Sequence, residues 1–126
     1  MIIDAWMQFP KRQFLFDPML DPLRRWPSHW RTLAEQDTDV DPEEALKSFA
    51  AEGVSAVVAS AWWSPRGPMI TNEEVADVVK RHPDRVVGIA SVDLASPMAA
   101  VRELRRCVKE FGKGRSGAPL ALGLTP

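Results

Sequence analysis

The chain has 126 residues, of which 45% are hydrophobic and 26% charged, and its formal net charge is −1. This length and composition are typical of one globular domain. Acidic and basic residues are interspersed, which argues against a nucleic-acid surface or a polybasic membrane patch. A single cysteine excludes an internal disulfide, and no signal peptide or membrane span is recognisable, so we expect a cytoplasmic protein.

The first predicted strand covers residues 2–6 of the opening stretch MIIDAWMQFP and ends close to Asp4. An irregular stretch follows over residues 7–40, rich in Pro, Trp and Arg, with one short helix predicted near 18–25. Connections of this length in a compact domain are usually functional loops or disordered segments.

Three helices and two further strands are predicted downstream. Asp41 and Pro42 favour a helix start, and Gly53 its end, before a second strand over VSAVVASAWW and a loop over SPRGPMI. Thr71 opens the next helix with a Thr-x-x-Glu capping box, and the third strand is RVVGIASVDL. The last helix begins at Ser96 and ends at residue 112.

Strands alternating with amphipathic helices predict an α/β fold with parallel strands, in roughly three βα units. These units fill residues 1–112. Residues 113–126 carry no regular pattern and are predicted to be a flexible tail.

Ligands bind at the carboxyl ends of parallel strands in such folds. Trp62 and Trp63 could either line a ligand pocket or simply pack in the core. Asp4 and Asp93 could either face a ligand or cap the backbone N–H groups that follow them. The candidate pocket consists of Asp4, Trp6, Gln8, Trp62, Ser64 and Asp93, with Ser60, Trp63 and Ser91 on the same rim.

Metal-ligand motifs are missing from the sequence. The two histidines, His29 and His82, are isolated, and there is no His-x-His, Cys-x-x-Cys or His-Glu-x-x-His spacing. His82 falls at a helix end, where a cation is favourable, and Cys107 falls inside a helix, where packing is expected rather than nucleophilic chemistry.

Three stretches together resemble the amidohydrolase-related family that includes aminocarboxymuconate semialdehyde decarboxylase. They are MIIDAWMQFP, SAWWSPRGPMITNEEVADVV and HPDRVVGIASVDLASPMAAVRELRRCVKEFG. The resemblance implies part of a TIM (β/α)8 barrel and metal-dependent hydrolysis or decarboxylation of small carboxylic acids, with zinc or manganese as the metal of an intact member. Trp6 and Gln8 occupy the two positions where the family has histidine ligands, so we predict no metal ligands in this chain.

A complete barrel needs about 250 residues. We therefore expect a truncated or frameshifted N-terminal piece, inactive by itself, which self-associates through exposed strand edges. Two alternatives stay open. One is a small non-catalytic binding module that uses the tryptophans at residues 26–30 and 62–63. The other is an enzyme assembled from several copies of the chain.

Overall fold

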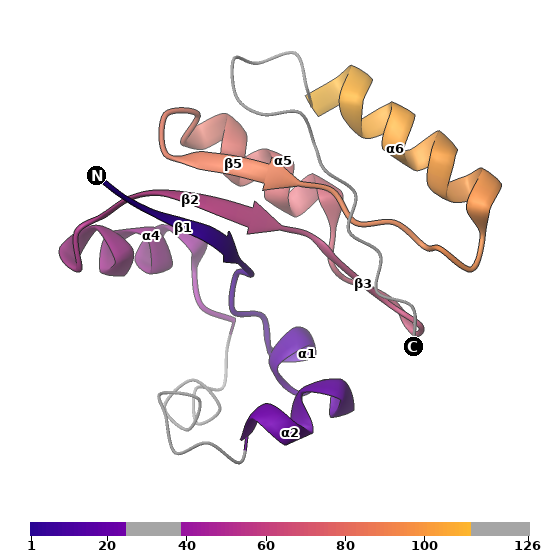
Figure 1. The fold of residues 1–126 in the computed structure, drawn as a ribbon, viewed down its shortest axis with the longest axis horizontal. Coiled ribbons are helices and arrows are strands. Elements are labelled where there is room, and N and C mark those ends of the chain that lie inside the picture. The colour runs from indigo at the N-terminus through magenta and orange to yellow at the C-terminus, as the bar shows by residue number, and fades with distance from the viewer. Residues whose placement is uncertain (25–38, 112–126) are drawn as a thin grey trace.

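A computed structural model of the chain describes residues 1–24 and 39–111. A three-stranded parallel sheet with the order β1-β2-β5 forms its centre (Figure 1). The strands are β1 (Ile2–Met7), β2 (Val54–Ser60) and β5 (Val86–Ile89). The predicted α/β fold with three parallel strands is therefore confirmed.

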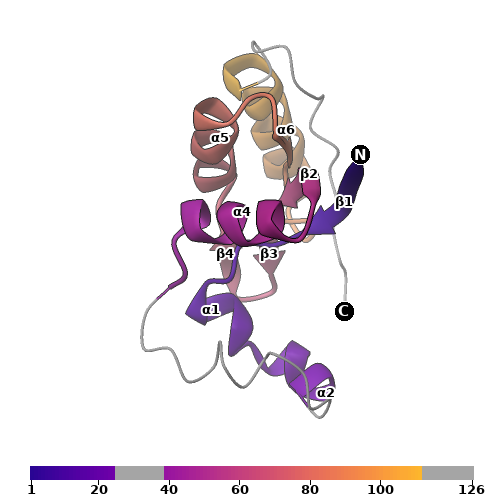
Figure 2. The same cartoon turned by 90° about the vertical axis from the view of Figure 1, so that its left-hand side faces the viewer.

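Helices α4 (Pro42–Ala51) and α5 (Asn72–Arg81) cover one face of the sheet (Figure 2). Val57, Ala59 and Val86 point into this layer and are buried in one core with Leu46 of α4 and Val75 of α5. The strand residues between them, such as Val58 and Val87, are only half-buried. One face of the sheet is thus packed against helices, and the other is partly open.

The predicted starts of α4 and α5 are confirmed. Asp41 accepts a hydrogen bond from the backbone N–H of Glu43 at 3.0 Å, and Thr71 and Glu74 form the predicted capping box of α5. The last helix, α6 (Pro97–Phe111), follows β5. In the described part of the chain, no helix has the length and apolar character needed to cross a bilayer.

The segment after β2 differs from the prediction. The expected continuous strand over residues 54–63 breaks at Ala61, and the expected loop contains a β-hairpin. Strand β3 (Trp62–Ser64) pairs with the antiparallel strand β4 (Gly67–Ile70) through a tight turn at residues 65–66. Gly67 adopts a φ of +114°, which a side chain would disfavour, so the glycine permits this turn.

The start of the stretch predicted to be irregular contains short helices. They are α1 (Arg12–Leu15), the 3-10 turn η1 (Pro18–Leu20) and α2 (Asp21–Arg24). Asp17 caps η1 and forms an ion pair with Arg66 in the hairpin turn, with 2.6 Å between Oδ2 and Nη2. This contact holds the hairpin against the first helices. The predicted tail at 113–126 and the segment at 26–30, including His29, lie outside the described residues.

Candidate functional site

Three polar side chains meet where β1 and β2 end. The indole Nε1 of Trp6 donates a hydrogen bond to Ser60 Oγ at 3.0 Å, and Gln8 Nε2 donates to the same oxygen at 2.7 Å. Ser60 is 2% exposed, whereas Trp6 is 53% exposed. The predicted rim residues Trp6 and Gln8 are therefore brought together, with the buried Ser60 hydroxyl as the shared acceptor. We call these three residues the Trp6 corner.

A bulge in β1 directs Trp6 toward this corner. Asp4 pairs with Val57 and Met7 with Ala59, so three steps along β1 face two steps along β2. Such a bulge re-aims a side chain and leaves a backbone group without a strand partner. Asp4 Oδ1 accepts a hydrogen bond from the Trp6 backbone N–H at 3.1 Å. Asp4 therefore caps the backbone that follows it, which is the alternative role expected for it.

The remaining candidates have local partners. Trp62 packs edge-on against Phe14, with ring centroids 5.1 Å apart, as expected from the packing alternative. Ser64 Oγ donates to the Gly67 carbonyl at 3.1 Å inside the hairpin turn, and Asp93 Oδ1 accepts from the Ala95 N–H at 3.0 Å. Within residues 1–24 and 39–111, no hydrogen bond or ion pair joins these three residues to the Trp6 corner.

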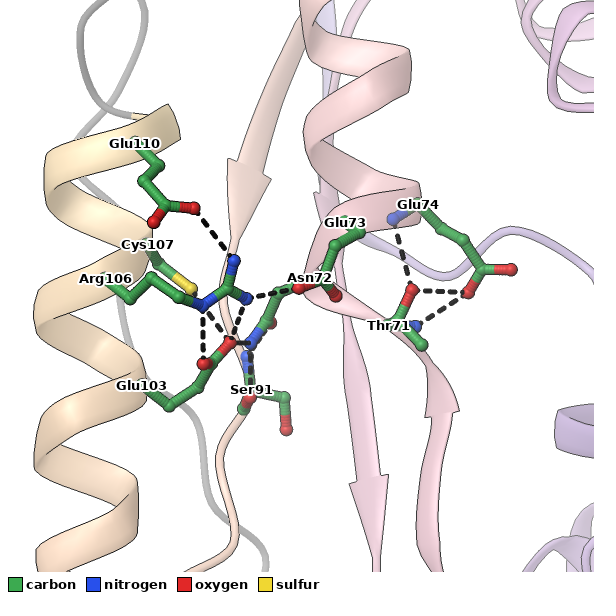
Figure 3. Close-up of polar contacts among 9 residues, drawn as sticks. All are labelled: Thr71, Asn72, Glu73, Glu74, Ser91, Glu103, Arg106, Cys107 and Glu110. Atoms are coloured by element: carbon green, nitrogen blue, oxygen red, sulfur yellow. Dashed lines mark hydrogen bonds and ion pairs between the residues drawn. The ribbon is translucent and has the colours of Figure 1, made fainter.

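The carboxyl end of β5 is held by Asn72, the first residue of α5 (Figure 3). Its amide accepts from the Ser91 N–H at 2.9 Å and donates to the Ser91 carbonyl at 3.0 Å, as a neighbouring strand would. Ser91 Oγ in turn accepts from the Trp63 N–H at 3.0 Å. Sequence reasoning missed Asn72, because nothing in the pattern distinguishes it from an ordinary first-turn residue.

The same amide anchors α6. Asn72 Nδ2 also donates to Glu103 Oε1 at 2.9 Å, and Arg106 binds both oxygens of Glu103 at 2.6 and 2.8 Å. Arg106 further contacts Glu73 and Glu110, as Figure 3 shows. Polar contacts therefore join α6 to the amino end of α5. Two apolar side chains of α6, Val101 and Val108, are exposed.

Because of Glu103, we expect the free energy of unfolding to vary with pH in the acidic range. The hydrogen bond from Arg106 lowers the pKa of Glu103 from 4.5 to about 2. A lowered pKa stabilises the folded chain fully above the ordinary value, and this contribution is lost as pH falls from about 4.5 to about 2. We expect the free energy of unfolding, measured by urea denaturation, to fall over this window. Glu103→Gln should show a smaller fall, and an identical fall would contradict this assignment.

Cys107 and His82 lie outside the Trp6 corner. Cys107 is 1% exposed, in agreement with the packing role expected for it, and burial, with the nearby Glu103, raises the pKa of its thiol to about 12. His82 closes α5, and its Nε2 lies 2.8 Å from a carboxylate oxygen of Glu43 on α4. This contact joins the two helices on the packed face.

The family model described as amidohydrolase matches residues 3–114. The chain belongs to the amidohydrolase family. The chain is 26% identical over 83 residues to 2-amino-3-carboxymuconate-6-semialdehyde decarboxylase of Dictyostelium discoideum, and this match covers 57% of the chain and 23% of that protein.

Two solved structures contain a part whose fold is similar to that of this chain. One is a dihydroxybenzoic acid decarboxylase from Polaromonas sp. JS666 with bound manganese and the inhibitor 2-nitroresorcinol (TM-score 0.59, 24% identity, 88% of this chain and 36% of that one). The other is an uncharacterised TIM-barrel protein from Bordetella bronchiseptica (TM-score 0.60, 19% identity, 86% of this chain and 40% of that one). The chain therefore spans less than half the length of these relatives.

The Trp6 corner does not offer the ligands that a divalent metal needs. An indole nitrogen carries a hydrogen and has no lone pair for a cation, and the Gln8 amide nitrogen donates to Ser60. Within the described ranges, no three His, Cys, Asp or Glu side chains are grouped as metal ligands would be. The corner instead presents neutral hydrogen-bonding groups beside an exposed aromatic ring.

Proposed function

We propose that the mouth formed by the ends of β1 and β2 recognises a small carboxylic acid of the kind that the family hydrolyses or decarboxylates. We further propose that this chain by itself does not catalyse the reaction. The observation that carries the proposal is the Trp6 corner. It stands where parallel α/β folds bind their ligands, and its side chains are an indole, an amide and a hydroxyl rather than imidazoles.

Family membership and the fold support the acidic substrate class. The Polaromonas relative is a dihydroxybenzoic acid decarboxylase, so a dihydroxybenzoic acid is a reasonable first ligand for this chain. Zinc or manganese chemistry, which we expect of intact members, would need ligands beyond Trp6 and Gln8. A cytoplasmic location and the absence of nucleic-acid and membrane partners stay predictions.

Self-association is the second part of this proposal. Strand β1 has one neighbour, β2, within the described sheet, and Ile2 and Ile3 on it are 55% and 51% exposed. A free strand edge with apolar side chains is a template for pairing with another chain. We infer that a second copy of the chain covers this edge.

Separate measurements on the same purified chain test binding, catalysis and assembly. We expect calorimetry to show saturable binding of a dihydroxybenzoic acid. An assay for carbon dioxide should detect no release from this acid, with or without added manganese. Light scattering behind size-exclusion chromatography should give a mass above the 14.1 kDa of one chain. Elemental analysis of that peak should find no stoichiometric zinc or manganese.

Each arm has an outcome that contradicts its part of the proposal. Absence of binding would overturn recognition of the acid, and release of carbon dioxide would overturn inactivity. Stoichiometric metal in the folded peak would contradict a corner without metal ligands. A mass of 14.1 kDa would show that copies do not associate.

A further inference from the structure

Trp6 combines an exposed ring with a fixed position. Its indole N–H is held by the buried Ser60 hydroxyl at 3.0 Å, and its backbone N–H is held by Asp4 at 3.1 Å. The residue is nevertheless 53% exposed. An aromatic side chain that is already ordered loses little conformational freedom when a ligand stacks on it. Trp6 therefore has the properties of a preformed stacking surface.

Gln8 supplies a polar edge to this surface. One N–H of its amide bonds to Ser60 at 2.7 Å, and the amide also has a second N–H and a carbonyl oxygen. Together these groups suit a hydroxyl, which both donates and accepts a hydrogen bond. The Asp4 carboxylate lies in the same bulge and repels an anion, so a neutral group is favoured at this edge.

We propose that the Trp6 corner binds a flat aromatic ring through its neutral hydroxyl edge. The ring stacks on Trp6, the hydroxyl contacts Gln8, and Asp4 positions Trp6 by capping the bulge. This inference rests on the proposed function, because it names the ring class of the same ligand and its orientation. The carboxylate of that ligand points away from Asp4.

Phenol is the direct probe, because it has the aromatic ring and the hydroxyl without a carboxylate. The indole N–H signal of Trp6 in a nitrogen-proton NMR spectrum reports on the corner, and its loss in Trp6→Phe identifies it. We expect phenol to shift this signal saturably. Cyclohexanol, which cannot stack, and benzoate, which is an anion without the hydroxyl, should each bind about tenfold more weakly.

Matched variants separate stacking from general apolar contact. Trp6→Leu should weaken phenol binding about tenfold, and Gln8→Leu about fivefold, measured by calorimetry. Met98→Leu changes an exposed side chain of α6, outside the rim, and should leave the affinity unchanged. Because phenol and cyclohexanol are compared on the unmodified chain, a variant that fails to fold does not hide the result.

Three results would overturn this inference: no saturable shift with phenol, an equal response to cyclohexanol, or full phenol affinity in Trp6→Leu. Failure of the proposed function is distinguishable from these. Phenol binding without binding of a dihydroxybenzoic acid would overturn the proposed substrate class and leave the corner as a phenol site. Binding of the acid without any response to phenol would overturn the inference alone.

Discussion

Replacing Asn72 with alanine is expected to lower the free energy of unfolding by about 2–4 kcal/mol. The Asn72 amide pairs with both backbone groups of Ser91 and with Glu103. Ser91 is 6% exposed, so water cannot readily replace these bonds. A buried polar group that loses its partner costs about 1–3 kcal/mol. Urea denaturation followed by far-UV circular dichroism measures the change.

Glu73→Ala is the matched control for Asn72→Ala. Glu73 is the next residue of α5, is exposed, and contacts Arg106 at the surface of the same network. An exposed ion pair contributes about 1 kcal/mol or less. A loss in Asn72→Ala no larger than that in Glu73→Ala would show that the amide does not hold β5 and α6 in place.

Gly88→Ala is expected to destabilise the fold by about 1–3 kcal/mol through overpacking. Gly88 lies on β5 beneath α5, and an added Cβ would stand 3.1 Å from methyl groups of both Val75 and Val79. Valine has little χ1 freedom in a helix, so neither side chain can turn away easily. The helix must then move off the strand. Thermal or urea unfolding of the variant measures the loss.

A double-mutant cycle with Val79→Ala tests the cause of this loss. Val79→Ala alone removes packing and should be destabilising. In the Gly88→Ala background it also makes room for the added methyl group, so its cost should be smaller by about 1 kcal/mol. Strict additivity of the two changes, or a Gly88→Ala variant as stable as the parent chain, would mean that α5 does not need the glycine for close approach.

The order of the three parallel strands and of helices α4, α5 and α6 could be predicted from local sequence, as could the family. Asp41 with Pro42, and Thr71 with Glu74, mark helix starts because their side chains bond to backbone groups only a few residues away. The apolar runs of β2 and β5 predict buried parallel strands for a similarly local reason. The opening stretch offers Trp6 and Gln8 and no histidine, which predicts a first strand without imidazole ligands.

The contacts that build the candidate site depended on tertiary structure. Ser60 accepts from Trp6 and Gln8 across 54 and 52 residues of chain, and Asn72 reaches Ser91 across 19. The pairs with Ser60 follow from the register of β1 against β2, and the bulge after Asp4 shifts that register by one residue. A shift of one residue changes which side chains meet, and no local pattern encodes it. The sequence determined which residue types reach the ends of the strands, and the fold decided that Trp6 and Gln8 share Ser60 while Trp62, Ser64 and Asp93 bond elsewhere.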